Sequence, residues 1–287
     1  MPIEVPNWIR PITDDEFYEL DYRVMAEAFK VHNELGRFCD EQIYQADLAA
    51  RLCQSGFPRL HRELPIEVSY RQFRKCYYVD LIVGPDSIYE LKAVAALLRE
   101  HQKQTLNYLF LMGLPHGKLI NFRGPSLEHE FVSTRITPVQ RRSLSFEDSR
   151  WRAVDEDSLR LRQLLTELLD DWGGLLELRL YREALVCLLG GPDQVVKTVE
   201  LSRHNLKLGR QSMDLLNDRV AFKLTAYGDH LSAVESHLRR LLSLAGLRAM
   251  HWINLHRFEV RLVTLFPRPI GQCRQNDWTD KMIPGSR

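Results

Sequence analysis

An internal repeat constrains the fold of this chain more than any other feature of its sequence. Short stretches of the first half recur in the second half in the same order, most of them at an offset of 133 residues. Gly113-Leu114 precedes Ile120-Asn121-Phe122 by the interval that also separates Gly246-Leu247 from Ile253-Asn254-Leu255. Similarity over this length favours duplication of a whole domain over a short solenoid repeat, although any two α/β domains share strand–turn–helix patterns.

The repeat predicts two domains and a connection between them. The first copy spans about 14–132 and the second about 158–266. Residues 133–157 contain several serines and arginines and have little periodicity, so we expect a linker there. The prolines and glycines of residues 267–287 predict a poorly ordered tail. Two similar domains on one chain are expected to form an internal pseudo-dimer.

Composition excludes several classes of protein. The 39 Lys and Arg residues balance 38 Asp and Glu residues, so the net charge of +1 excludes a protein held to nucleic acid by its overall field. A hydrophobic content of 45% excludes wholesale disorder. Five scattered cysteines without a CxxC pair are typical of reduced thiols and predict a cytoplasmic protein. No stretch approaches the ~18 apolar residues of a membrane span, and the N-terminal residues lack the apolar core of a signal peptide.

Periodicity in the first copy predicts a mixed α/β domain. Thr13 and Glu16 have the spacing of a capping box, and apolar residues at intervals of three and four continue to Gly36. A second helix is expected from about Phe38 to Gly56. Three strands, a helix and a fourth strand are then expected at 66–70, 76–83, 87–94, 95–112 and 118–122.

Three residues of this copy form the sharpest candidate site. Glu90 and Lys92 are two apart on an expected strand and therefore point to one face of the sheet, and Asp80 lies on the preceding strand of the same hairpin. Two carboxylates on one face favour a divalent cation such as Mg²⁺, which takes carboxylates, waters and phosphate oxygens. Lys92 could orient or deprotonate an attacking water, or stabilise charge on a phosphate. The alternative is an ordinary Glu–Lys pair on a solvent-facing hairpin.

Polar residues of two helices add to this candidate site. Glu41 lies near the start of the second helix. His101, Gln104 and Tyr108 are spaced by three and then four, so they share one face of the third helix. Such a face could bind nucleic acid, with donors for phosphates and an aromatic surface for a base.

These residues occur within a pattern that resembles the GxxExxY proteins of the PD-(D/E)XK nuclease superfamily. The resemblance covers about residues 14–125, and four residues rather than two separate Gly36 from Glu41. The segments that carry it are Glu34–Tyr44, Tyr78–Val83, Tyr89–Val94, Gln104 with Tyr108, and Gly117–Phe122. The resemblance implies a restriction-endonuclease-like αβββαβ core, present twice if the repeat is a duplication. It also implies metal ligation by Asp80 and Glu90, a catalytic Lys92, and Glu41 as the acid that completes the site.

The second copy lacks most of these residues. At the offset of 133, Glu90 falls on Lys223 and Lys92 on Thr225, while Gln104 and Tyr108 fall on His237 and Leu241. Asp214 is expected opposite Asp80, and Glu177 lies near the position of Glu41. We therefore expect a degenerate repeat that keeps the fold, has lost the chemistry, and either packs against the first copy or extends a nucleic-acid surface.

The sequence thus predicts a Mg²⁺-dependent nuclease with one site, in the N-terminal copy, that cleaves the phosphodiester bonds of DNA. Mn²⁺ is the alternative metal and RNA the alternative substrate. A competing hypothesis is a non-catalytic module that keeps the nuclease fold and binds nucleic acid or protein. A third is a structural scaffold without metal affinity.

Overall fold

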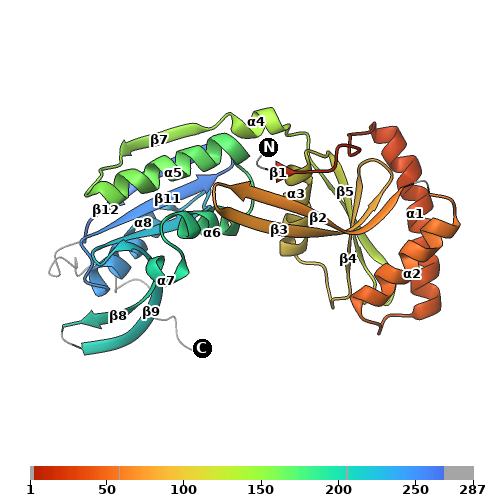
Figure 1. Cartoon of the computed structure of the whole chain (residues 1–287). Coiled ribbons are helices and arrows are strands. Elements are labelled where there is room, and N and C mark those ends of the chain that lie inside the picture. The colour runs from red at the N-terminus through yellow and green to blue at the C-terminus, as the bar shows by residue number, and fades with distance from the viewer. Residues whose placement is uncertain (1–2, 58, 205, 268–287) are drawn as a thin grey trace, which may run out of the picture. The chain divides into compact units, whose positions relative to one another are not determined.

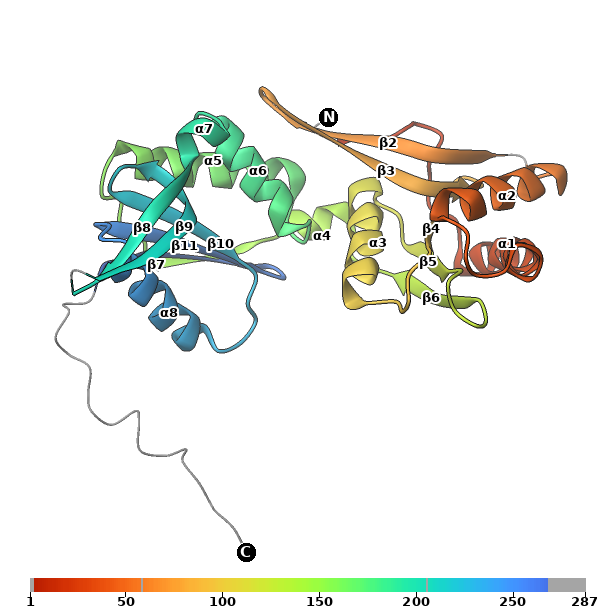
Figure 2. The ribbon, with the colours of Figure 1, turned by 90° about the horizontal axis from the view of Figure 1, so that it is seen from below.

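The computed structural model describes residues 3–57, 59–204 and 206–267 (Figures 1 and 2). They form a mixed α/β structure with two six-stranded sheets. The chain divides into two compact units. The first contains the described residues of Met1–Ser145, Gln163–Leu188 and Arg257–Glu259, and the second those of Phe146–Arg162, Leu189–His256 and Val260–Arg287.

The first unit has the predicted order of helix, helix, three strands, helix and strand. Thr13 accepts a hydrogen bond from the Glu16 amide while the Glu16 carboxylate accepts one from the Thr13 amide, which confirms the capping box. The second helix starts at Glu41, not near Phe38. The elements are β1 (Ile3–Glu4), α1 (Asp14–Leu35), α2 (Glu41–Gln54), β2 (Leu60–Tyr70), β3 (Phe73–Val83), β4 (Ser87–Lys92), α3 (Arg99–Met112), β5 (His116–Asn121), β6 (Glu128–Ser133), α4 (Pro138–Arg142), the second part of α5 (Glu156–Trp172), and α6 (Leu178–Leu188).

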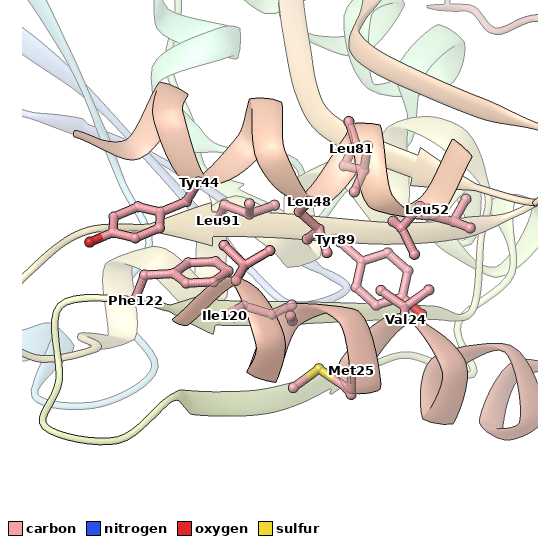
Figure 3. Packing of buried hydrophobic residues seen from close by; sticks show 14 of the residues in the cluster. Val24, Met25, Tyr44, Leu48, Leu52, Leu81, Tyr89, Leu91, Ile120 and Phe122 are labelled. Carbon is pink, nitrogen blue, oxygen red and sulfur yellow. The ribbon is translucent and has the colours of Figure 1, made fainter. Parts of the chain in front are cut away.

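The strands of this unit are ordered β1-β2-β3-β4-β5-β6. Helix α3 connects β4 to β5, which run parallel, whereas the neighbouring pairs β3–β4 and β5–β6 are antiparallel. One face of the sheet packs on α1 and α2 (Figure 3). Tyr44 stacks on Phe122 there, and its hydroxyl donates to the Gly36 carbonyl at 2.9 Å and accepts from the Cys39 amide at 3.0 Å. These bonds fix the turn from α1 into α2.

Residues 163–188 cover the β2–β3 hairpin within the same unit. The Trp172 indole donates to the Ser69 carbonyl at 3.1 Å and contacts the rings of Tyr70 and Phe73. The Tyr70 hydroxyl donates to Glu167 at 2.8 Å. This unit is therefore completed by a segment that lies well beyond its sheet in the sequence.

The second unit holds a sheet of order β7-β12-β11-β10-β9-β8. As in the first unit, a helix connects two parallel strands, here α8 between β10 and β11. Its elements are β7 (Ser145–Arg150), the first part of α5, α7 (Pro192–Val195), β8 (Val196–Arg203), β9 (Leu206–Asn217), β10 (Val220–Thr225), α8 (Leu231–Leu244), β11 (Ala249–His256) and β12 (Glu259–Leu265).

The two parallel strand pairs have the same register at the offset of 133. Lys92 stands opposite Asn121 in the first unit, and Thr225 stands opposite Asn254 in the second. The Asn121 side chain accepts from the amide of Val94 and donates to its carbonyl, at 3.0 and 2.9 Å. Asn254 makes the same two bonds to Tyr227, both at 2.9 Å. Each asparagine thus fixes the chain just after the central parallel strand.

The expected linker, 133–157, contains helix α4 and strand β7. Strand β7 lacks the alternation of polar and apolar residues because it is an edge strand without a buried face. The expected disordered tail, 267–287, lies outside the described residues except for Pro267. Within the described ranges, none of the helices has the length and hydropathy of a membrane span.

Candidate active site

The β3–β4 hairpin and the start of α2 bring four predicted residues together. Leu81 pairs with Tyr89, so Asp80 on β3 lies next to Glu90 on β4. Leu81, Tyr89 and Leu91 belong to the core cluster against α1 and α2. Because side chains alternate along a strand, Glu90 and Lys92 point to the other face of the sheet.

The Lys92 ammonium lies among three carboxylates. Its Nζ is 2.8 Å from Glu90 Oε1, 3.7 Å from Asp80 Oδ2 and 4.0 Å from Glu41 Oε1. Asp80 Oδ2 also accepts from the amide of Leu91 at 2.8 Å, which fixes this carboxylate against β4. Glu41 is the first residue of α2, where the helix dipole favours a negative charge.

Exposure increases across the site from Glu90 to Glu41. The Glu90 side chain is 1% exposed and that of Lys92 11%, whereas those of Asp80 and Glu41 are 21% and 42% exposed. The site therefore has a buried floor formed by Glu90 and Lys92. Its opening to solvent lies on the side of Glu41.

Burial and mutual repulsion shift the pKa values of these carboxyls. Burial raises the pKa of Glu90 to about 8, and the charge of Asp80 adds to the effect. Burial also raises the pKa values of Asp80 and Glu41, against the opposing effect of Lys92. Burial disfavours the charged form of Lys92, but Glu90 and Asp80 outweigh it and the pKa of Lys92 lies above its ordinary value. The site thus concentrates negative charge that a cation stabilises.

One oxygen of the site has no partner. Glu90 Oε2 is buried and makes no hydrogen bond, although an orphaned carboxylate oxygen costs free energy. Among the described residues, no three His, Cys, Asp or Glu side chains form a ready-made metal cage. Mg²⁺ needs only one or two carboxylates, with waters in its other positions. Asp80 and the free oxygen of Glu90 meet that requirement, so the residues present fit a divalent cation.

The three predicted nucleic-acid-binding residues differ in accessibility. Gln104 is exposed and its amide donates to the Tyr108 hydroxyl at 3.1 Å. Tyr108 is only 5% exposed, and its ring meets that of Tyr77 edge-on, so it offers its hydroxyl to the site and no open ring to a base. The charges of Glu90 and Asp80, together with burial as the largest cause, raise the pKa of Tyr108. His101 accepts from the Leu98 amide at 3.0 Å and so closes the start of α3.

Sequence reasoning missed two residues that hold the site in place. Gln45 is buried one turn after Glu41, and its amide donates to the Asp80 carbonyl at 2.7 Å, which ties α2 to β3. The helical spacing from Glu41 was the signal for it. Asn121 fixes the chain after Lys92 through Val94, and its recurrence as Asn254 was the signal for that role.

One known family matches the part of the chain that contains the candidate site. The model of the PD-(D/E)XK nuclease superfamily matches residues 18–134. Residues 18–134 are therefore a PD-(D/E)XK nuclease superfamily domain. All of the candidate residues from Glu41 to Tyr108 fall within that range, and nucleases of the superfamily generally use divalent metals. Neither the curated proteins nor the solved structures gave a match.

Proposed function

We propose that the protein is a metal-dependent nuclease that hydrolyses the phosphodiester bonds of DNA, with Glu41, Asp80, Glu90 and Lys92 as its active site. The observation that carries the proposal is the unpartnered, buried Glu90 Oε2 beside Asp80 on one sheet face. A buried carboxylate oxygen without a donor is suited to a metal ion. The superfamily match over the same residues supports this reaction class.

Asp80 and Glu90 would hold the metal, with Glu41 completing the set from α2. Mg²⁺ is the proposed ion because all three ligands are carboxylates. Mn²⁺ is the alternative, because carboxylate oxygens also suit it. When bound, the cation lowers the pKa of a coordinated water and offsets negative charge on the phosphate.

The remaining residues bind and orient the substrate. Lys92 is charged, and its ammonium would orient the attacking water and donate to a phosphate oxygen. The sugar–phosphate backbone of the nucleic acid would bind on the side of α3. Its contacts there would be the exposed amide of Gln104, the hydroxyl of Tyr108 and His101. Backbone contacts of this kind admit RNA as the alternative substrate.

We also infer that the second copy is a degenerate repeat of the first. The shared order of elements and the paired bonds of Asn121 and Asn254 support a duplication. Lys223, at the place of Glu90, is exposed, and Thr225, at the place of Lys92, donates to Asn254 at 2.7 Å. The internal pseudo-dimer and the GxxExxY subfamily remain predictions.

The register moves Asp214 away from the place that the sequence suggested. Leu81 stands opposite Tyr89, and Asp214 stands opposite Phe222, which lies 133 residues after Tyr89. Asp214 thus corresponds to Leu81 and not to Asp80. This one-residue shift further supports the loss of the metal site from the second copy.

The competing function is a module that binds nucleic acid or protein without cleaving it. The near-zero net charge and the degenerate second half favour this alternative. We propose the cytoplasm as the location in either case, from the scattered cysteines.

A cleavage assay separates the two functions. Single- and double-stranded DNA and RNA are incubated with wild type, Glu90→Gln, Lys92→Ala and Asp40→Asn, in Mg²⁺, in Mn²⁺ and in EDTA. Asp40 is the matched control, because it is exposed, adjoins Glu41 and makes no side-chain capping bond. We expect metal-dependent cleavage by wild type and Asp40→Asn alone. Equal cleavage by Glu90→Gln would reject the site, and binding without cleavage by wild type would favour the competing module.

A further inference from the structure

Two hairpins occupy the same place in the two sheets, and each extends beyond its neighbouring strand. In the first unit, β3 pairs with β4 only through Leu81–Val83. In the second, β9 pairs with β10 only through residues 214–217, so the part of β9 from Leu206 to Met213 pairs with β8 alone. The β8–β9 hairpin is therefore an arm attached at one end to its sheet.

The cations near the turn of the β2–β3 hairpin are paired with carboxylates of the first unit. Arg71 pairs with Glu167 at 2.8 Å, and Arg74 pairs with Glu67 at 3.4 Å. Lys75 pairs with two carboxylates at 2.9 Å, both from 163–188. These charges serve the fold of the unit itself.

The cations of the β8–β9 arm are mostly without such partners. Residues 197–210 contain four Lys and Arg residues against the single acid Glu200, an excess of three positive charges on a chain whose net charge is +1. Lys207 pairs with Glu200 at 3.0 Å. In the described part of the chain no carboxylate pairs with Lys197, Arg203 or Arg210, and the Lys197 ammonium donates to the Asp193 carbonyl at 2.7 Å.

The arm is also open to solvent. Every residue of β9 from Leu206 to Ser212 is exposed, including the side chains of Leu206 and Leu208 at 64% and 51%. Exposed cations in excess along an extended ribbon attract a polyanion with regularly spaced charges, which describes the phosphate backbone of nucleic acid. The two leucines supply apolar contact for sugars or bases beside it.

We propose that the β8–β9 arm is a second nucleic-acid contact that binds the phosphate backbone through Lys197, Arg203 and Arg210. This inference rests on the proposed function, because it takes nucleic acid as the ligand. The degenerate copy would then bind nucleic acid, a function that needs no metal site. This contact also explains how a chain with a near-zero net charge holds a polyanion, since the charge that matters is local.

The test compares two charge-matched double variants of the full chain. Arg203→Gln with Arg210→Gln removes two charges from the arm, and Arg71→Gln with Arg74→Gln removes two exposed charges from the equivalent hairpin. Fluorescence anisotropy of labelled single-stranded and duplex DNA is measured in EDTA, so that no cleavage occurs, over a series of salt concentrations. The arm variant should bind duplex about tenfold more weakly at low salt, with a salt slope reduced by about 2. The control variant should bind within about twofold of wild type.

Each other outcome contradicts the inference in a distinct way. Equal weakening in both variants would show a general field and not a local contact. Unchanged binding in the arm variant would remove the arm from the interface while leaving the proposed nuclease intact. No binding by wild type would overturn the proposed function and the arm together. Binding to phosphatidylserine vesicles is measured in parallel, and an arm variant that retains DNA binding but loses affinity for the vesicles would assign the arm to a lipid surface.

Discussion

The Lys92 ammonium lies 2.8 Å from one oxygen of Glu90, while the other oxygen of the same buried carboxylate has no partner. Lys92 therefore donates a hydrogen bond to only one of the two carboxylate oxygens of Glu90. The ammonium stabilises the negative charges of the candidate site, and one carboxylate oxygen is left without a partner. Stability and chemistry consequently respond differently to changes at the two residues.

Lys92→Met should lower the free energy of unfolding by about 2–3 kcal/mol, because it leaves the partly buried carboxylate of Asp80 without its cation. Glu90→Gln should change it by less than about 1 kcal/mol, since burial already favours the neutral form of Glu90. Both variants should lose cleavage. Urea denaturation at pH 7 with a parallel cleavage assay measures the contrast. Equal stability of the two variants would contradict the central role of the ammonium.

Divalent metal should stabilise the first unit against heat. A ligand at 100 times its Kd adds about 2.7 kcal/mol to the stability of the state that binds it. Thermal unfolding with and without Mn²⁺ should show this gain in wild type and in Asp40→Asn, and should not show it in Asp80→Asn. Glu41→Gln should weaken binding by about tenfold, since its carboxylate is the most exposed of the three. A full shift in Asp80→Asn would place the metal elsewhere.

Acid should destabilise the second unit through His251. This ring is buried between the Ser158 and Thr264 hydroxyls, at 2.8 and 3.2 Å, and stacks on Trp151. Burial lowers the pKa of His251 to about 4, below its ordinary value of 6.5. The unfolded chain therefore binds the proton first as the pH falls. The stabilisation from the neutral ring is complete above pH 6.5 and is lost towards pH 4, by up to about 3 kcal/mol.

The matched comparison for this effect is His237→Gln, which changes an exposed histidine of the same unit. Denaturation midpoints of the second unit between pH 7 and pH 4 should fall steeply in wild type and in His237→Gln. The fall should be shallow in His251→Gln, whose amide can bond both hydroxyls without taking up a proton. A parallel fall in all three proteins would exclude His251 as the cause.

Asp21 and Lys118 form a buried ion pair in the first unit, and the effects of their substitutions on stability should not be additive. Lys118 Nζ donates to Asp21 Oδ2 at 2.7 Å, with both residues almost fully buried, and Asp21 Oδ1 has no partner. Asp21→Leu or Lys118→Met alone should cost about 3–5 kcal/mol, because each leaves an uncompensated charge. The double variant should recover most of the loss. Chemical denaturation of the four proteins gives the coupling energy, and additive losses would show that the two charges do not interact.

Most of the helices and strands of the first unit could be predicted from the sequence, because the signals for them are local. The capping box of Thr13 and the alternation around Glu90 depend on residues close in the chain, and both were recognised. Edge strands β6 and β7 were missed, since an edge needs backbone pairing and not a buried face. Strand β2 starts at Leu60 and not at the expected Ile66. Its first residues are exposed or only partly buried, so they do not show the pattern of a strand with one buried face.

The residues of the candidate site and the shared face of Glu90 and Lys92 were expected from the sequence, but the contacts among the side chains were not. Period-two spacing brought Glu90 and Lys92 to one face, but no local pattern indicates that Lys92 lies among three carboxylates. Gln45 is recognisable only once α2 is seen against Asp80. The place of Asp214 depends on a strand register that a constant offset cannot resolve.

The indole of Trp172 on Ser69 sets a condition on how the chain can fold as it is made. The matched nuclease domain ends at residue 134, but the cover of its β2–β3 hairpin is synthesised only with residues 163–188. Until that segment leaves the ribosome, Tyr70 and Phe73 lack the ring on which they pack. A fragment that ends at residue 134 would leave Tyr70 and Phe73 without that cover, so we expect the shortest stable form of the matched domain to include residues 163–188.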